Sequence, residues 1–490
     1  MDELLEMFHM DTEIHADAIK HAWDKHFTKA ECRLFFQPEF WDSATQKILN
    51  KEFHLAPMYE CYLDKKTDKR MTYKQAKARN FENVRKYYKS RKVDSVIINA
   101  IYQVFYRKFS YLIHPLCCSY KKDESTRKVV NRVARDFSEM MFYRGFKEDI
   151  VKFFDSVALP VIDATTEFFD SLCPSAFRYL LDELFHDDRI IISEEALKDP
   201  DFVKNNKYEM FYDNELKKEV PMIRKFCSLK QGCAMAAFYA DIVLRDVDEF
   251  MSTQPVTYYR YSDDCIIVGK GTSASKAKYR MSQMLKEKGL RFNPDKTEKI
   301  SENTWVTFLG FKIKKDQITI SGDTLKNVTH KIKEETVCRS KQLRRALTEN
   351  ELRRAIDNIQ YWLFVGTRDT EAGMGAYLYG AINDMHDLGL IDTYAKDCIR
   401  AAATNKCDIY GLVPIRKEHG IMAGGNDKKG VFHPGRNVGM NKLKTEGLPE
   451  RLGWYSLIHM YKKFHSGTDV YKAEVLRMRN GECFEGEKND

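Results

Sequence analysis

The sequence predicts an α+β fold in which a small antiparallel sheet is backed by helices, with a mostly helical chain elsewhere. Residues 256–270 (VTYYRYSDDCIIVGK) read as two strands around a tight polar turn. Helical periods flank this hairpin at residues 233–250 and 276–290, and Gly289 closes the second of them. A strand pattern returns at residues 304–320. The order of strand, helices, hairpin, helix and strands is typical of an α+β domain.

The remaining segments are predicted in chain order. Residues 1–60 read as helices and turns. Residues 61–140 are basic and mostly helical in pattern, with a core helix at residues 93–113. Residues 149–157 (DIVKFFDSV) are β-branched and aromatic, which favours a strand. Residues 325–409 have a helical pattern throughout.

Composition argues against several classes of protein. The sequence has no run of about 18 uncharged apolar residues, so no membrane span is expected. Its acidic, amphipathic N-terminus does not resemble a secretory signal. The 12 cysteines form no CxxC pair, which favours reduced thiols in a cytosolic protein. His15, His21 and His26 are six and five residues apart, so they do not share a helix face and do not predict a metal site.

Positive charge is concentrated in one early segment. From Lys65 to Lys92 there are twelve Lys or Arg residues against two acids, with Tyr and Phe residues among them. Clustered cations neutralise phosphates, and interleaved aromatic rings can stack on bases. A solvated helix face would show the same charge run, so charge alone leaves both interpretations open.

Three aspartates predict the chemistry of the protein. Asp263 and Asp264 are adjacent in a turn between apolar strands, where like charges repel unless a cation lies between them. Asp149 lies on its own predicted strand. If these strands are neighbours, the three carboxylates can hold two Mg²⁺ about 4 Å apart, as in two-metal transfer reactions. Taken singly, each segment is also compatible with a plain turn cap or a strand-edge acid.

Five short segments, in order along the chain, resemble motifs of reverse transcriptases. Tyr261–Ser262–Asp263–Asp264, preceded by Arg260, resembles the YxDD box. The other matches are residues 149–156 (first metal motif), 228–232 (GxPQG), 293–297 (NPxKT) and 308–311 (FLGF), with a weaker one at 119–127 (SYGFR of intron-type enzymes). The resemblance covers roughly residues 85–330 and implies a right-hand polymerase of fingers, palm and thumb.

With this resemblance, the chain is expected to contain five regions. They are an N-terminal helical extension (1–60), fingers (61–140), a palm (141–320) with an insertion near 180–225, a helical thumb (321–410) and a C-terminal part (411–490). The C-terminal part begins with a loop segment that has nine glycines in residues 411–453 and then returns to a helix. An RNA contact, an oligomer arm and a surface loop are equally compatible with the Gly-rich segment.

The resemblance also implies roles for single residues. Asp149, Asp263 and Asp264 would hold two Mg²⁺, with Mn²⁺ as a substitute. Phe154 would exclude a 2′-hydroxyl and favour deoxynucleotides, unless the adjacent Phe153 takes that place. The predicted nucleotide contacts are Gln231, Gly232, Lys296 and Arg91, with Arg70 and Arg127 as alternatives to Arg91. The predicted contacts with the primer end are Phe308, Leu309 and Gly310. The predicted RNA contacts are Lys65, Lys66, Lys69, Arg70, Lys86, Lys89, Lys341, Arg344 and Arg345.

Several positions depart from the family pattern. Ser228 and Lys230 replace the usual Gly and Pro, and Asp241 replaces an expected asparagine. With the long gap from Asp149 to Gly232, these departures resemble divergent bacterial reverse transcriptases of phage defence, with a palm like that of intron and retron enzymes. The resemblance implies DNA synthesis from dNTPs on a dedicated noncoding RNA in a bacterial cytoplasm, and leaves self-association and the primer open.

Two other functions stay open at this point. RNA-dependent RNA synthesis or template-independent nucleotide addition would use the same aspartates, although the Tyr-Ser-Asp-Asp box and Phe154 favour deoxynucleotides. A catalytically silent RNA-binding scaffold is the third reading. The three retained aspartates argue against it, since buried unpaired acids are costly without a metal.

Overall fold

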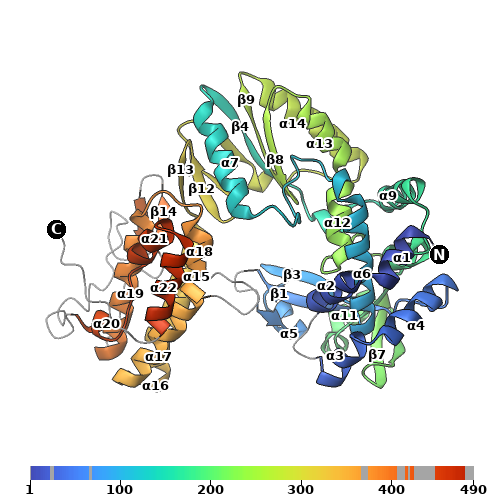
Figure 1. Cartoon of the computed structure of the whole chain (residues 1–490), viewed down its shortest axis with the longest axis horizontal. Coiled ribbons are helices and arrows are strands. Elements are labelled where there is room, and N and C mark those ends of the chain that lie inside the picture. Colours follow the sequence, from blue (N-terminus) through green and yellow to red (C-terminus); the bar gives the residue numbers. More distant parts are fainter. Residues whose placement is uncertain are drawn as a thin grey trace. The chain divides into compact units, whose positions relative to one another are not determined.

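The computed structural model divides the chain into two compact units (Figure 1). The first unit consists of Met1–Lys122 and Arg144–Lys299, and the second of Asp123–Tyr143 and Ile300–Asp490. The structure describes residues 2–22, 27–65, 69–365, 374–404, 414–417, 420–423 and 447–479. No helix among these residues is long and apolar enough to cross a membrane.

A four-stranded sheet carries the predicted aspartates. Its strands lie in the order β10 (Glu298–Ser301), β4 (Tyr143–Asp149), β9 (Asp264–Lys270) and β8 (Thr257–Tyr261). β8 and β9 are antiparallel, with Tyr261 opposite Asp264, so the predicted hairpin is confirmed. Helices α13 (Arg245–Ser252) and α14 (Ser273–Glu287) pack against β8 and β9 (Figure 1). The predicted helix end at Gly289 is also confirmed, because Gly289 has a φ of 78°.

The strand predicted at residues 149–157 is wrong beyond Asp149. β4 ends at Asp149, and Lys152 then adopts a left-handed backbone conformation with φ 45° and ψ 47°. A left-handed residue cannot continue a strand. The short helix α8 (Phe153–Ser156) follows, so the aromatic residues project from a helix rather than from a strand.

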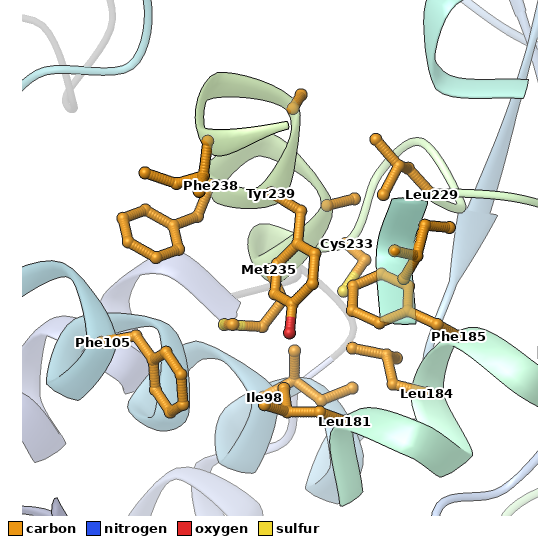
Figure 2. Packing of buried hydrophobic residues seen from close by; sticks show 14 of the residues in the cluster. Ile98, Phe105, Leu181, Leu184, Phe185, Leu229, Cys233, Met235, Phe238 and Tyr239 are labelled. Carbon is orange, nitrogen blue, oxygen red and sulfur yellow. The ribbon is translucent and has the colours of Figure 1, made fainter. Parts of the chain in front are cut away.

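An aromatic and aliphatic core packs against the segment that resembles GxPQG. It is formed by α6 (Lys92–Phe109), α9 (Leu159–Leu172), α10 (Arg178–His186) and α12 (Ala234–Ile242). Figure 2 shows Phe185 of α10 beside Tyr239 of α12, and their ring centroids are 4.5 Å apart. Burying one Phe side chain stabilises a fold by about 1.5–3 kcal/mol. α6 confirms the predicted core helix, whereas the single helix predicted at residues 233–250 is two helices, α12 and α13.

A six-stranded sheet joins two distant parts of the first unit. Strands β1 (Met58–Asp64), β2 (Arg70–Met71) and β3 (Val84–Lys89) come from the predicted fingers, and β5 (Arg189–Ile191), β6 (Tyr208–Asp213) and β7 (Lys218–Arg224) come from the predicted insertion. The order is β2-β1-β5-β7-β6, β3 pairs with β1, and β1 and β5 are parallel. The mostly helical pattern expected for residues 61–140 is therefore wrong for β1–β3, where charged residues obscure the strand alternation.

The N-terminal helices pack on the core helix α6. Helices α1 (Glu3–Met10) and α2 (Thr12–Ala22) contact α6 directly. His15 stacks on Trp41 with ring centroids 3.8 Å apart, and the His15 ring bonds to the carbonyl of Phe8, so its role is packing. His26 lies outside the described residues. The other helices of this unit are α3 (Lys29–Phe35), α4 (Pro38–Leu49), α5 (Tyr73–Ala78), η1 (Ser110–Leu112), η2 (Glu194–Lys198), α11 (Pro200–Asn205) and η3 (Pro294–Lys296).

The second unit combines a small sheet with a helical bundle. Strands β11 (Val306–Phe308), β12 (Phe311–Lys314) and β13 (Gln317–Ile320) form the antiparallel sheet predicted at residues 304–320, and α7 (Thr126–Glu139) packs against it. A short hairpin joins β14 (Pro414–Lys417) and β15 (Gly420–Ala423). The helices are α15 (Gly322–Lys333), η4 (Glu334–Cys338), α16 (Arg339–Leu343), α17 (Glu349–Gln360), η5 (Tyr361–Val365), α18 (Met374–Tyr379), α19 (His386–Thr404), α20 (Leu448–Arg451), α21 (Leu457–His465) and α22 (Thr468–Arg479).

These elements confirm the predicted α+β class, with small sheets in a mostly helical chain. The helical pattern predicted from residue 325 is also confirmed as far as the structure describes it. Most of the Gly-rich segment 411–453 lies outside the described residues. The nine cysteines whose side chains the structure describes are all free thiols.

Candidate active site

The structure brings the three predicted aspartates together at one end of the four-stranded sheet. Asp149 is the last residue of β4, and Asp263 and Asp264 lie where β8 turns into β9. The backbone N–H of Ile150 donates to the carbonyl of Asp263 at 3.0 Å, which fixes the two segments to each other. Burial, together with the charges of Asp264 and Asp149, raises the pKa of Asp263 to about 6. The three carboxylates therefore share one electrostatic environment.

Two lysines balance this negative charge. Lys296 Nζ lies 2.7 Å from Asp149 Oδ2, and the Lys296 side chain is 58% exposed. Lys147 Nζ lies 3.2 Å from Asp264 Oδ1 and 3.8 Å from Glu298 Oε1, and this side chain is only 13% exposed. Burial alone would lower the pKa of Lys147, but Asp264 and Glu298 raise it above its ordinary value. Lys147 was missed in the sequence, although it precedes Asp149 by two residues and so shares its strand face.

The donor set suits a hard divalent cation. Carboxylate oxygens are the ligands that Mg²⁺ prefers, and three of them repel one another here unless positive charge is supplied. Within the described residues, no group of three or more His, Cys, Asp or Glu side chains has an arrangement that could hold a metal ion as it stands. Lysine ammonium groups lie against two of the three aspartates, and the Lys296 side chain is exposed enough to move away. Asp149, Asp263 and Asp264 are thus the residues that would hold such an ion.

The predicted sugar-contacting Phe154 is tied to the GxPQG-like segment. The amide of Leu229 donates to the carbonyl of Phe154 at 2.9 Å, and Ser228 Oγ donates to the carbonyl of Val157 at 2.6 Å. Phe153 is only 2% exposed and packs in the core, whereas Phe154 is half-buried. Of the two adjacent rings, Phe154 is the one accessible to a ligand.

Gln231 and Gly232 lie against strand β3. The amide of Tyr88 donates to the carbonyl of Gln231 at 2.7 Å. Gly232 has a φ of +110°, and a Cβ added there would come within 2.7 Å of the Tyr88 carbonyl oxygen. Only glycine fits this backbone and this close approach.

Lys230, which replaces the usual proline of the motif, has a structural role. Its side chain is buried, and Nζ donates to the carbonyls of Leu184 at 2.6 Å and Asp187 at 2.7 Å. These carbonyls end helix α10, where a cation is favourable. Burial lowers the pKa of Lys230. The ammonium group therefore anchors the loop to α10 in this chain.

Arg91, the predicted triphosphate arginine, is paired with the insertion. Its Nη2 lies 3.4 Å from Asp213 Oδ1, its guanidinium lies 5.5 Å from the centroid of Phe211, and its side chain is 14% exposed. Both partners are on β6. The alternative Arg70 is exposed on β2, and Arg127 belongs to the second unit, where it packs against Gly380.

A further cation, Arg85, influences a tyrosine that contacts the aspartate turn. The Tyr120 hydroxyl is 3.5 Å from Ser262 Oγ. Burial raises the pKa of Tyr120, and the nearby charge of Arg85 lowers it. Arg85 is exposed on β3 and was not singled out in the sequence, because no motif marks it.

The residues predicted to support the primer lie in the second unit. Phe308 is fully buried, and Leu309 and Gly310 form the β11–β12 turn with φ values of 50° and 85°. Tyr377 donates its hydroxyl to the Leu309 carbonyl at 2.9 Å, which fixes the turn to α18.

The predicted RNA-contacting cations differ in their availability. Lys86 pairs with Glu60 at 2.7 Å, and Arg345 pairs with both oxygens of Glu351 at 2.8 Å. Lys89 on β3 is half-buried. Lys66 lies outside the described residues. Arg345 is exposed despite its ion pair, and the other exposed members are Lys65, Lys69, Arg70, Lys341 and Arg344.

Comparison with known proteins agrees with the motif analysis. Residues 74–313 match the family model described as reverse transcriptase (RNA-dependent DNA polymerase). No curated protein matches the chain. Among solved structures, one similar chain is apo telomerase from Candida tropicalis truncated from its C-terminal domain, with 12% identity and a TM-score of 0.35, over 58% of this chain and 61% of that chain. Another is telomerase from Candida albicans in complex with the TWJ fragment of telomeric RNA, with 12% identity and a TM-score of 0.29, over 66% of this chain and 58% of that chain. The chain spans about three fifths of these two structures.

The family match runs from helix α5 to strand β12 and includes all three aspartates, the Gln231–Gly232 loop and the Lys296 segment. The mixed helix-and-sheet fold is consistent with the right-hand polymerase architecture that the motifs imply. On this evidence, residues 74–313 of the chain form a reverse transcriptase domain.

Proposed function

We propose that this chain is an RNA-directed DNA polymerase that joins dNTPs at a two-Mg²⁺ site held by Asp149, Asp263 and Asp264. The observation that carries the proposal is the convergence of three carboxylates from neighbouring strands, whose charges raise the pKa of Asp263. Mn²⁺ would bind the same oxygen ligands. When bound, the two ions would activate the attacking hydroxyl and stabilise the leaving pyrophosphate.

The side chains around the aspartates supply positioning and selectivity. Lys296 would release Asp149 and bind the triphosphate of the nucleotide, since its side chain is mostly exposed. Phe154 would close the space that a ribose 2′-hydroxyl needs. Gln231 and Gly232 would let the backbone approach the template base and the nucleotide. Arg91 could bind the triphosphate only if its ion pair with Asp213 breaks.

RNA is the template that we propose, bound mainly through its phosphates. The exposed cations Lys65, Lys69, Arg70, Lys341 and Arg344 support this, because such contacts depend little on sequence. RNA binding should therefore weaken steeply as the salt concentration rises, and a flat salt response would count against these residues.

We also propose a dedicated noncoding RNA, a bacterial cytoplasmic location and a role in phage defence, on the basis of the departures from the family pattern at Ser228, Lys230 and Asp241. Self-association of the chain is compatible with this role.

The decisive experiment measures Mg²⁺-dependent incorporation of labelled dNTP by the full chain, compared with an Asp263→Asn/Asp264→Asn double variant. RNA and DNA that copurify with each protein are sequenced in parallel. One enriched RNA, with complementary DNA that is absent from the double variant, is expected. Enriched RNA without any DNA that depends on the aspartates would favour RNA synthesis or a binding role.

The sugar preference tests Phe154 separately. Phe154→Ala should raise ribonucleotide use relative to deoxynucleotide use, because it opens the space beside the sugar. Phe153→Leu is the matched control, since Phe153 packs in the core. An unchanged sugar preference in Phe154→Ala would remove its assigned role.

A further inference from the structure

A buried arginine lies directly behind the aspartate turn. Arg260 is the fourth residue of β8 and has no exposed surface. Its Nε donates to Asp248 Oδ1 at 2.8 Å and its Nη2 donates to Asp248 Oδ2 at 2.6 Å. This two-point contact fixes the plane of the guanidinium group. Asp248 lies on helix α13 and is also fully buried, and it accepts a third bond from Tyr258 at 2.9 Å.

The remaining donors of Arg260 reach two backbone carbonyls, one in the turn and one on helix α12. Nη1 donates to the carbonyl of Ser262 at 3.3 Å, and Nη2 donates to the carbonyl of Asp241 at 3.1 Å. Ser262 has a φ of 55°, a conformation that non-glycine residues rarely adopt. The Ser262 carbonyl belongs to the peptide unit that leads into Asp263. The guanidinium group therefore holds a disfavoured backbone conformation next to two of the proposed metal ligands.

A second carboxylate and a neighbouring chain segment complete the arrangement. Asp241 Oδ1 lies 3.7 Å from Arg260 Nη1 and accepts bonds from Ser119 Oγ at 2.5 Å and Cys117 Sγ at 3.2 Å. The backbone of Arg260 is paired as well, because its N–H donates to Leu116 at 3.0 Å and its carbonyl accepts from Cys118 at 2.7 Å. Asp241 is the residue that replaces the asparagine expected in the family. In this chain it supplies a second negative charge beside Arg260.

Stability alone does not account for this arrangement. A buried ion pair is expensive to desolvate, and apolar side chains of similar volume often stabilise a core equally well. An apolar pair, however, has no donor for the Ser262 carbonyl. We propose that Arg260 is a positioning residue that, through Asp248 and Asp241, sets the orientation of Asp263 and Asp264 for metal binding. This inference rests on the metal-binding role proposed for these two aspartates.

The test separates positioning from folding. The full-length variant Arg260→Met/Asp248→Leu/Tyr258→Phe replaces the ion pair by apolar groups and leaves no orphaned hydroxyl. Its melting temperature should fall, because the buried Asp241 loses its counter-charge, while the Mg²⁺ concentration for half-maximal dNTP incorporation, measured below the unfolding transition, should rise about tenfold, as for other residues that orient metal ligands. kcat should fall, with a smaller change in the KM for dNTP. A folded triple variant with the parent's Mg²⁺ requirement and kcat would overturn the proposal.

Two milder variants decide the question if the triple variant does not fold. Arg260→Lys keeps the charge but cannot bond to both Asp248 oxygens and Ser262 together. Tyr258→Phe removes one hydroxyl that holds Asp248. Both should raise the Mg²⁺ requirement, Arg260→Lys more than Tyr258→Phe. A folded protein with no change in this requirement, for either variant, would contradict the proposal.

Controls distinguish this inference from the proposed function. Arg400→Lys makes the same change in a half-buried pair of the second unit, where Arg400 lies 3.1 Å from Asp397, and should leave the Mg²⁺ requirement unchanged. If Asp263→Asn/Asp264→Asn stays active, the proposed function fails. If this double variant is inactive but the Arg260 variants keep the parent's Mg²⁺ requirement, only the positioning inference fails.

Discussion

The two sheets of the first unit are held together in different ways. The four-stranded sheet places charged groups at its end, where Lys147 and Lys296 balance three mutually repelling aspartates. The six-stranded sheet uses its charges as ties between distant segments, as in the pairing of Asp213 on β6 with Tyr59 on β1. The charged groups of the four-stranded sheet therefore surround the proposed metal site, whereas those of the six-stranded sheet stabilise the fold. Substitutions in the two sheets should accordingly affect different quantities, namely rate and stability.

The largest effect is expected at Asp149. Asp149→Asn removes one of three proposed metal ligands, so kcat should fall by roughly a hundredfold to a thousandfold, as when one preorganised charge contact is lost. Stability should change little or rise, because the mutual repulsion of the carboxylates is relieved. Steady-state incorporation and thermal melting measure the two quantities. Glu287→Gln, an exposed acid on α14, is the control, and equal activity in both variants would break the comparison.

Asp213→Ala should act on stability instead. Asp213 has no exposed surface, and it accepts bonds from Tyr59 and from the amides of Glu215 at 2.8 Å and Leu216 at 3.0 Å. Its removal leaves Arg91 without its carboxylate, which should cost about 3 kcal/mol in urea unfolding. Glu209→Ala, an exposed position on the same strand, should cost far less. A raised KM for dNTP without loss of stability would instead connect Arg91 with the nucleotide.

Gly232→Ala tests the loop that meets strand β3. The added Cβ would be strained at a φ of +110° and would come within 2.7 Å of the Tyr88 carbonyl oxygen. We expect a loss of about 1–3 kcal/mol in unfolding free energy, together with a lower kcat/KM for dNTP. Gly271→Ala is the matched control, because it has a φ of +58° but nothing within 4 Å of the added Cβ. Equal effects on kcat/KM would show that the close approach to Tyr88 is unimportant.

The smallest effect concerns the pH dependence contributed by Asp94. Burial raises the pKa of this α6 carboxyl to about 6, although it accepts a bond from Ala56 N at 3.0 Å. The folded state therefore binds the proton more tightly than the unfolded state. The contribution of Asp94 to stability should fall as pH rises from about 4 to 6. Asp94→Asn should flatten the stability profile in this window, and an unchanged slope would contradict the assignment.

The sequence predicted which aspartates come together better than it predicted the surroundings that position them. The hairpin around Asp263 and Asp264 was correct, because apolar strands around a polar turn leave a clear local pattern. Residues 149–157 were assigned to a strand that in fact ends at Asp149, because β-branched and aromatic composition cannot reveal the left-handed turn at Lys152. Lys147 carries no motif, and its contact with Asp264 depends on strand pairing.

Long-range pairing explains what else the sequence could not predict. Arg91 stays a prediction for the triphosphate contact, and its partner Asp213 on a strand of the insertion could not be foreseen. The acidic insertion itself gave no sign that its strands would join β1. Lys230 was noted as a departure from the motif, and only the fold reveals the carbonyls of α10 that it anchors.

The parallel pairing of β1 with β5 has a consequence for synthesis of the chain on the ribosome. Met58 lies opposite Ile190, and β7, which covers the other side of β5, ends only at Arg224. The early strands therefore emerge long before their partners and leave one edge unpaired, which slows folding and exposes an aggregation-prone edge. Slowing translation between β3 and β5 should lengthen this exposed interval, and chaperones that shield strand edges would matter most during it.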